Sequence, residues 1–376
     1  MIVVSENAHT EVTDRDTTLD WIDGSLAALC LGSLVVVVAG GLVQVSFGAF
    51  SMSVAEAWRA VLDPAVLFDR RVWEAFLLGG PLPELGNRTL VIWNIRLPRV
   101  FVAVLVGMNL AVSGAIFQAV TRNELASPFI LGVSSGAGLM ILLTLVVFSG
   151  LTAFLPLIAA VGGAVAFLIV YAIAWQNGTS PVRLVLAGVI VGTVFGSLQT
   201  AFFFFADDIG VVQSAIAWTT GSLTGTDWEQ VRMALPWTVV AMALALVGSR
   251  QLNVLLLGES TAKSLGMDVE TVRFALSGVA VLAAAASIAV AGIVGFVGLI
   301  VPHMVRNLVG SDYKKLVVGC VFAGPALLVA ADVGARLGMP LLTGSSTQVP
   351  VGILTGLVGG PYFLYLMRRQ GNLGEL

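Results

Sequence analysis

Two arginines flank a Leu-Pro pair in the stretch Ile95-Arg96-Leu97-Pro98-Arg99. A guanidinium group presents a planar fork of N–H donors that matches a carboxylate. Immediately after these residues the chain turns apolar, from Val100 to Val120. Charges at the mouth of an apolar segment need water or a partner, so the stretch predicts a charged rim at the end of a membrane helix.

Catalytic patterns are missing from the sequence. The two histidines, His9 and His303, stand far apart, and no HExxH, GxSxG or GxxxxGK[ST] pattern occurs. The chain is therefore not expected to be an enzyme or to bind nucleotide phosphates in a P-loop. Cys30 and Cys320 have neither metal-site nor disulfide-framework spacing, which favours two small buried apolar residues.

The polar residues inside the apolar segments are almost all neutral: Asn109, Ser113, Gln118, Ser197, Gln199 and Thr200. A proton- or sodium-driven porter usually keeps an ionisable group at mid-membrane. The closest charged pair here, Asp332 and Arg336, is expected to form a local i,i+4 ion pair at a helix end. An ion-coupled secondary transporter using Asp332 is thus a remote alternative. The energy source should lie in a separate chain.

The composition defines the class of protein. The 376 residues are 57% hydrophobic and 11% charged, with a net charge of −3 and a mean hydropathy of +0.97. A soluble domain is about a quarter charged, so this is a polytopic membrane protein. The long apolar runs do not alternate, which predicts an all-α fold rather than a barrel. No basic block suggests nucleic acid, and the acidic residues 1–24 predict a tail rather than a cleavable signal.

Ten spans are predicted in residues 25–367, followed by a tail at 368–376. They cover about 25–45, 93–119, 129–149, 153–175, 182–205, 233–249, 272–290, 293–309, 315–331 and 350–367. Gly292, Gly295 and Gly298 break one apolar run into the seventh and eighth spans, which predicts a shortened helix there.

The positive-inside rule predicts the orientation of these spans. With the N-terminus inside, eleven bases lie on the inner side: Arg15, Arg122, Arg183, Arg250, Lys263, Arg273, Arg306, Lys314, Lys315, Arg368 and Arg369. Eight lie outside, six of them in the loop 46–92 and its end: Arg59, Arg70, Arg71, Arg88, Arg96 and Arg99. The protein is expected in the plasma membrane of the cell. Both of its termini should then lie in the cytoplasm, and Arg96 and Arg99 should lie on the outer side.

Three further features concern packing and contact surfaces. Two double GxxxG stripes predict close helix packing: Gly188, Gly192 and Gly196, then Gly352, Gly356 and Gly360. The external segment 206–231 should hold a short helix from Val211 to Thr219. The cytoplasmic segment 250–271 should hold another, capped by Ser260 and stopping at Gly266, with Asp268 capping the next helix.

Several blocks together resemble the permease subunits of type II ABC importers, which take up cobalamin, ferric siderophores and haem. The blocks are "IRLPR" at 95–99, "GMNLAVSGAIFQAVTRNELASPFILGVSSGAG" at 107–138, "LGESTAKSLGM" at 257–267, "GFVGLIVPHMVRNLVGSDYKKL" at 295–316, "ADVGAR" at 331–336 and "VPVGILTGLVGGPYFLYLM" at 349–367. The resemblance covers nearly the whole chain from the first span onward.

The resemblance implies the assembly. It implies ten helices per subunit, with spans two to five and seven to ten as inverted repeats, and a homodimer with the pathway at its axis. It also implies two ATPase subunits inside, which bind ATP and Mg, and a substrate-binding protein outside. This chain itself would bind no cofactor and no metal.

The resemblance also assigns residues to roles. Docking of the binding protein falls to Arg96, Arg99 and Arg336. ATPase coupling falls to the loop 258–267, through Gly258, Glu259, Ser260, Ala262, Lys263, Leu265 and Gly266. The cytoplasmic gate falls to Asn123 and Leu125 and, more loosely aligned, Thr179 and Ser180. The fifth helix lines the pathway, with Gly188, Gly192, Gly196 and Gln199, while His303 and Arg306 are expected in structural or interface roles.

Two positions depart from the family pattern, and the cargo is open. Glu124 stands where the family usually has proline, and Gln348 stands where a glutamate often occurs. The neutral polar residues and the "VIWNIRLPR" block favour cobalamin as cargo over a ferric siderophore, with haem third.

Overall fold

The computed structural model describes residues 21–48, 50, 52–81, 83–206, 208–344 and 348–371. Most of the predicted acidic tail, residues 1–20, and the last five residues of the chain lie outside this part. Side chains of residues 366–371 also lie outside it, so nothing follows for Arg368 and Arg369.

The described part of the chain is built from helices. They are α1 (Gly24–Ser46), α2 (Val54–Val61), α3 (Pro64–Leu67), α4 (Arg70–Leu78), α5 (Asn87–Val91), the π-helical turn η1 (Ile92–Arg96), α6 (Leu97–Thr121), α7 (Val133–Val146), the 3₁₀ helix η2 (Ser149–Phe154), α8 (Leu155–Ala174), α9 (Pro181–Phe203), α10 (Ile209–Thr220), α11 (Trp228–Val247), α12 (Ser249–Leu256), α13 (Glu259–Ser264), α14 (Val269–Ala291), α15 (Val297–Val309), α16 (Tyr313–Thr343) and α17 (Val351–Gly371). The all-α prediction is confirmed for these residues.

Seven helical segments of this part are long and apolar enough to cross a membrane: 24–46, 87–121, 149–174, 181–203, 228–247, 269–291 and 313–340. Three shorter apolar helices, at 133–146, 297–309 and 351–365, fall where the third, eighth and tenth spans were predicted. The chain is thus a multi-pass membrane protein, while a count of ten crossings stays a prediction.

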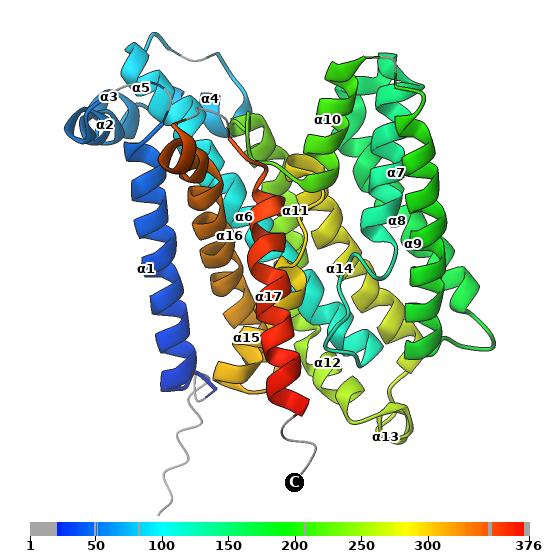
Figure 1. The fold of residues 1–376 in the computed structure, drawn as a ribbon. Helices are drawn as coiled ribbons and strands as arrows, with labels where there is room; N and C mark the ends of the chain where they lie inside the picture. Colours follow the sequence, from blue (N-terminus) through cyan, green and yellow to red (C-terminus); the bar gives the residue numbers. More distant parts are fainter. Residues whose placement is uncertain are drawn as a thin grey trace, which may run out of the picture.

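The bundle has two distinct ends (Figure 1). Helix α1 begins, and α17 ends, at the end of the bundle where α12 and α13 lie. The short helices α2 to α5 and α10 lie at the opposite end. We call these the α13 end and the α10 end.

Helix α6 is the centre of the bundle. In its most apolar stretch 78% of the residues are buried, against 22% in α9. Glycines allow its neighbours to approach, since a Cβ on Gly107 would lie 2.6 Å from the Gly324 carbonyl on α16. A Cβ on Gly114 would likewise collide with the Gly298 carbonyl on α15. Backbones in contact at these points fix α6 against both helices.

The predicted break between the seventh and eighth spans is confirmed. Helix α14 ends at Ala291, Gly292 has φ +68°, and Phe296 has φ +66° before α15 begins. Backbone hydrogen bonds tie this break to the end of α10: Ile293 N–H donates to the Trp218 carbonyl and Ser222 N–H to the Ala291 carbonyl. The break is therefore a fixed junction.

The glycine stripes are only partly used for packing within the chain. A Cβ on Gly188 would collide with the Ile130 carbonyl, and one on Gly352 with the Thr220 carbonyl. At the third glycine of each stripe, Gly196 and Gly360, a Cβ would meet nothing within 4 Å. Each stripe thus packs at one end and faces open space at the other.

Candidate functional site

The arginines of the two charged motifs meet at the α10 end, where α1 ends. Arg96, Arg99 and Arg336 are only 1%, 7% and 8% exposed. The π-helical turn η1 places Arg96 so that it donates to the carbonyl of Val45 on α1 and, at 2.8 Å, to that of Phe50. Arg336 donates to the Gln44 carbonyl at 2.9 Å. Both guanidinium groups therefore hold the end of α1 against α6 and α16.

Asp332 pairs across helices rather than along its own. Its carboxylate accepts from Nε and Nη2 of Arg99 at 2.8 and 2.7 Å, and from the Gln44 amide at 3.0 Å. The local i,i+4 pair predicted between Asp332 and Arg336 is wrong, because Arg99 on α6 reaches both carboxylate oxygens in a bidentate geometry. Gln348 accepts from the remaining Arg99 nitrogen at 2.6 Å.

These contacts bear on the docking prediction. Within the described chain all three guanidinium groups are turned inward and hydrogen-bonded. A partner carboxylate could reach them only if the surrounding segments moved apart. Docking on Arg96, Arg99 and Arg336 stays a prediction.

At the other end of the bundle, α13 is the predicted short helix of segment 250–271. Gly258 occupies its N-cap with φ +102° and no side-chain cap. The predicted Ser260 cap is wrong, because Ser260 already lies inside the first turn. Asp268 does cap α14 by accepting from the Thr271 N–H. The hydrogen bond from the Thr271 hydroxyl, and then that from the Thr271 N–H, lower the pKa of Asp268.

The predicted coupling residues divide into two sets by burial. Ser260, Lys263, Leu265 and Gly266 are exposed, while Gly258 and Ala262 are buried. Glu259 is turned inward, toward α14. Only the first set offers a surface to a partner in this conformation.

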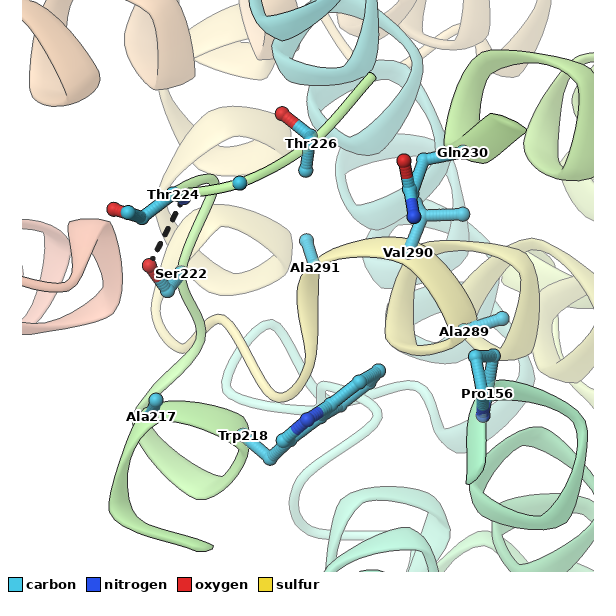
Figure 2. Close-up of a pocket in the computed structure, with 11 residues that line it drawn as sticks. Pro156, Ala217, Trp218, Ser222, Thr224, Thr226, Gln230, Ala289, Val290 and Ala291 are labelled. Carbon is cyan, nitrogen blue, oxygen red and sulfur yellow. Dashed lines mark hydrogen bonds between the residues drawn. The ribbon is translucent and has the colours of Figure 1, made fainter. Parts of the chain in front are cut away.

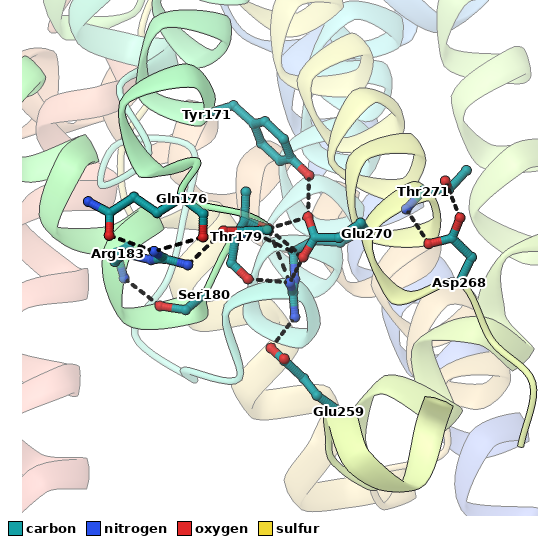
Figure 3. Close-up of polar contacts among 11 residues, drawn as sticks. Tyr171, Gln176, Thr179, Ser180, Arg183, Glu259, Asp268, Glu270 and Thr271 are labelled. Carbon is teal, nitrogen blue, oxygen red and sulfur yellow. Dashed lines mark hydrogen bonds and ion pairs between the residues drawn. The ribbon is translucent and has the colours of Figure 1, made fainter. Parts of the chain in front are cut away.

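A buried arginine, Arg273, connects this region to the loop before α9. Figure 3 labels its partners Glu259, Glu270 and Thr179. Arg273 on α14 donates to Glu259 at 2.5 Å, to Glu270 at 2.9 Å and to the Thr179 carbonyl at 2.8 Å. Glu270 in turn accepts from the backbone N–H and hydroxyl of Thr179. Thr179, predicted as a gate residue, is therefore a buried member of this network. Ser180 caps α9 by accepting from the Arg183 N–H.

The other predicted part of the cytoplasmic gate, Asn123 and Leu125, lies in the loop that follows α6. Leu125 is exposed, and the Asn123 side chain accepts from its N–H at 2.9 Å. Glu124, one of the departures from the family pattern, lies 3.3 Å from Arg306 and 3.4 Å from His303 on α15. An ion pair thus ties this loop to α15, which agrees with a structural role for His303 and Arg306.

One face of α9 is exposed and carries hydroxyl groups. Thr193, Ser197 and Thr200 are exposed, and each hydroxyl donates to the carbonyl four residues earlier. A cavity of about 420 Å³ adjoins this face. Its lining includes Ser134, Ser135, Gly188, Gly192, Thr193 and Gln199, with no charged side chain among them. The Gln199 amide donates to the Ser135 carbonyl at 3.0 Å.

A second cavity of about 350 Å³ lies beyond the α10–α14 junction (Figure 2). The Trp218 ring lies along one side of it, and Ser222, Thr224, Thr226 and Gln230 contribute neutral polar groups. Both cavities adjoin the junction, since Trp218 and Ala291 line one and Thr219 and Ile293 line the other.

Asn109, Ser113 and Gln118 do not line these cavities. All three are buried and bond to neighbouring helices, through Thr238, the Ala280 carbonyl and the Leu299 carbonyl respectively. The exposed hydroxyl groups of Thr193, Ser197 and Thr200, by contrast, all lie on α9.

Residues 34–369 match the FecCD transport family, and the chain belongs to that family. It is 40% identical over 289 residues to the Fe(3+)-citrate import system permease protein YfmD of Bacillus subtilis, covering 77% of this chain and 84% of that protein. It is 41% identical over 290 residues to the cobalamin import system permease protein BtuC of Halobacterium salinarum, covering 77% and 76%. The chain is thus a membrane permease of the ABC importer class, which has no ATPase site of its own.

A solved structure described as an inward-facing metal-chelate type ABC transporter has the same fold. It superimposes with a TM-score of 0.75 at 26% identity, covering 91% of this chain and 99% of the other.

Sequence reasoning missed Arg273, Glu270 and Gln44. Arg273 and Glu270 could have been noticed as an i,i+3 pair in the first turn of an apolar helix. Gln44 offered no such signal, because its partner Asp332 is 288 residues away.

Proposed function

We propose that the chain is the membrane permease of an ATP-driven importer of a metal chelate, and that it works as a homodimer. The observation that carries this proposal is the uncharged cavity beside the hydroxyl-bearing face of α9 in a chain of this family. A wall of neutral hydroxyl and amide groups allows a large chelate to pass without trapping it, since it offers no strong charge–charge contact. Ten crossings with inverted repeats and cytoplasmic termini complete the proposed architecture.

The ATPase subunits would bind at the α13 end. Leu265 there is 63% exposed, and Ser260 and Lys263 lie exposed beside it. An exposed leucine beside a lysine suits the apolar centre and polar rim of a protein interface. ATP and Mg would be bound by those subunits.

This contact is tested by co-purification with ABC ATPase subunits from the same organism. Leu265→Asp should lose the ATPase, because it places a charge at the centre of the contact. Leu78→Asp serves as the matched control, since Leu78 is 81% exposed at the opposite end. Equal recovery of the ATPase with both variants would contradict the assignment.

Cobalamin is our first candidate cargo, and ferric chelates are the alternative. The neutral lining supports a cargo with little net charge, but the iron-citrate and cobalamin permeases are almost equally similar to this chain. The test is uptake of labelled cyanocobalamin, ferric citrate, a ferric hydroxamate and haemin by cells with and without the gene. If cobalamin uptake is the same with and without the gene, the proposed cargo becomes whichever ferric chelate needs the gene for uptake. If uptake of none of the four compounds needs the gene, the proposed function is overturned.

Docking of an external binding protein on Arg96, Arg99 and Arg336 is the least direct part of the proposal, because these groups are buried. Arg96→Glu with Arg99→Glu should abolish docking, but would also break internal contacts. The exposed Arg59 and Arg71 at the same end provide matched charge reversals that leave the interior intact. Loss of docking in Arg59→Glu or Arg71→Glu, with docking retained in Arg99→Lys, would place the contact on the exposed arginines instead.

A further inference from the structure

The guanidinium group of Arg273 is the point where three segments of the chain meet. Its side chain is 1% exposed, although it lies in the first turns of α14 near the α13 end. It bonds to Glu259 on α13, to Glu270 on α14 and to Thr179 in the loop before α9. A fully buried arginine is costly unless its charge is compensated, so these contacts hold the three segments together.

The loop before α9 is itself tied to α9. Arg183 in the first turn of α9 donates to the Gly178 carbonyl at 2.6 Å and to the Gln176 side chain at 2.9 Å. The Gln176 N–H also donates to the Gly178 carbonyl, and Ser180 caps α9 (Figure 3). These contacts join the segment 176–180 to the first turn of α9.

The route from α13 to this segment runs through Arg273. Among the described residues, no hydrogen bond or ion pair runs directly from 258–266 to 175–183. Glu259 is the acidic side chain of α13 that reaches inward, and Arg273 is what it reaches. If α13 moves and Glu259 stays bonded, then Arg273 and the Thr179 carbonyl must follow.

We propose that Arg273 is a positioning residue that transmits movement of α13 to the loop 176–180 and to the base of α9, through Glu259 on one side and Thr179 and Glu270 on the other. We call this set the Arg273 bridge. The proposal rests on the proposed function, because it assigns the movement of α13 to the ATPase cycle. Movement of α9 would then change the cavity that it lines.

The first experiment measures the distance between α13 and the base of α9. Spin labels are placed at Ser264→Cys and Val182→Cys, both exposed, after replacing Cys30 and Cys320. The complex of permease and ATPase is studied in lipid nanodiscs with and without ATP and Mg. With the native Arg273 bridge, α13 and the base of α9 should move together. The distribution of distances between the two labels should therefore stay narrow and unchanged when ATP is added. In Arg273→Met and Glu259→Gln the distance should match the native value without nucleotide and change when ATP is added.

The second experiment measures coupling in proteoliposomes, as labelled cyanocobalamin or ferric citrate imported per ATP hydrolysed. Arg273→Met should lower this ratio about tenfold, within the usual range of coupling between sites. ATP hydrolysis itself should persist. Thr271→Val is the matched control, because Thr271 lies two residues before Arg273 and its hydroxyl bonds to Asp268, outside the Arg273 bridge.

Glu259→Gln and Glu270→Gln test whether the two sides act in series. A double variant no worse than the worse single variant supports a series arrangement, whereas additive losses would overturn it. If Arg273→Met fails to assemble, Arg273→Lys and Glu259→Gln provide the same measurements.

The outcomes distinguish two failures. Suppose the native complex imports chelate and Arg273→Met imports within twofold as much chelate per ATP hydrolysed. If the spin-label distance in Arg273→Met also responds to ATP as in the native complex, the Arg273 bridge alone is overturned. A native permease that binds no ATPase overturns the proposed function, and the Arg273 bridge with it.

Discussion

At the scale of single residues, this protein buries charge where three or more segments have to be held together. Arg99 with Asp332 does this at the α10 end, and Arg273 with Glu259 and Glu270 does it at the α13 end. Arg99 and Asp332 come from α6 and α16, and Arg273 reaches Glu259 on α13 as well as Glu270 on its own helix. Such pairs favour one arrangement of the segments that they join. Removal of one partner leaves an uncompensated buried charge.

Asp332→Asn should lower the free energy of unfolding by about 3–5 kcal/mol, because it leaves the buried Arg99 without its counter-charge. Arg70→Ala is the control, since it breaks the exposed pair with Glu74, worth about 0.3–0.5 kcal/mol. Thermal unfolding in detergent measures both. Similar losses for the two variants would show that the Arg99–Asp332 pair is solvated rather than buried.

The ion pair between Asp23 and Lys315 predicts a pH effect. The Lys315 ammonium, then the Leu26 N–H and the Ser25 hydroxyl, hold the pKa of Asp23 well below its usual range. A lowered carboxyl pKa stabilises the fold above the ordinary value of about 3.9, and this contribution is lost as the pH falls through the folded-state pKa. The stability difference between the native chain and Asp23→Asn should therefore be constant near neutrality and shrink below about pH 4.

Asparagine also caps helices well, so this substitution isolates the charge. In a Lys315→Met background the same substitution should have a smaller effect at neutral pH. A difference that stays flat throughout acid unfolding would exclude the ion pair as its cause.

How much of this could be predicted depends on how local the signal is. Asp268 as a cap and the short helix before Gly221 follow from neighbours in sequence, and both predictions are confirmed. Ser260 failed as a cap because Gly258 begins α13 two residues earlier. Asp332 was assigned to its sequence neighbour Arg336, since nothing local points to Arg99 on a helix 233 residues away.

At the scale of elements, α6 is positioned by backbone contact rather than by large side chains. Glycines face glycines where α6 crosses α15 and α16. Helices in lipid associate by such close packing and by hydrogen bonds between helices. Helix α9 lacks this support over most of its length and keeps an exposed face.

Gly114→Ala should therefore destabilise the fold by about 1–3 kcal/mol, because the added methyl group would lie 1.8 Å from the Gly298 carbonyl. Gly278→Ala is the control, since a Cβ there meets nothing within 4 Å and alanine favours a helix by about 1 kcal/mol. The comparison uses unfolding midpoints of the two variants in the same detergent. Equal midpoints would mean that α6 and α15 are further apart than described.

At the scale of the whole molecule, the distribution of bases between the two ends of the bundle predicts which end is cytoplasmic. The loop 52–88 at the α10 end pairs Arg70, Arg71 and Arg88 with nearby acids. At the α13 end, Arg250 and Lys263 are exposed on α12 and α13. Under the predicted topology eleven bases fall on the side of α13 and eight on the side of α10. The positive-inside rule counts bases rather than net charge, so it favours the α13 end as cytoplasmic.

This orientation can be measured with single cysteines in a chain where Cys30 and Cys320 have been replaced. Leu265→Cys lies at the α13 end and Glu84→Cys at the α10 end, and both positions are exposed. A membrane-impermeant maleimide should label Glu84→Cys in intact cells, and Leu265→Cys only after the membrane is opened. The reverse pattern would place α13 outside, where no ATPase could reach it, and the proposed function and the Arg273 bridge would both be wrong.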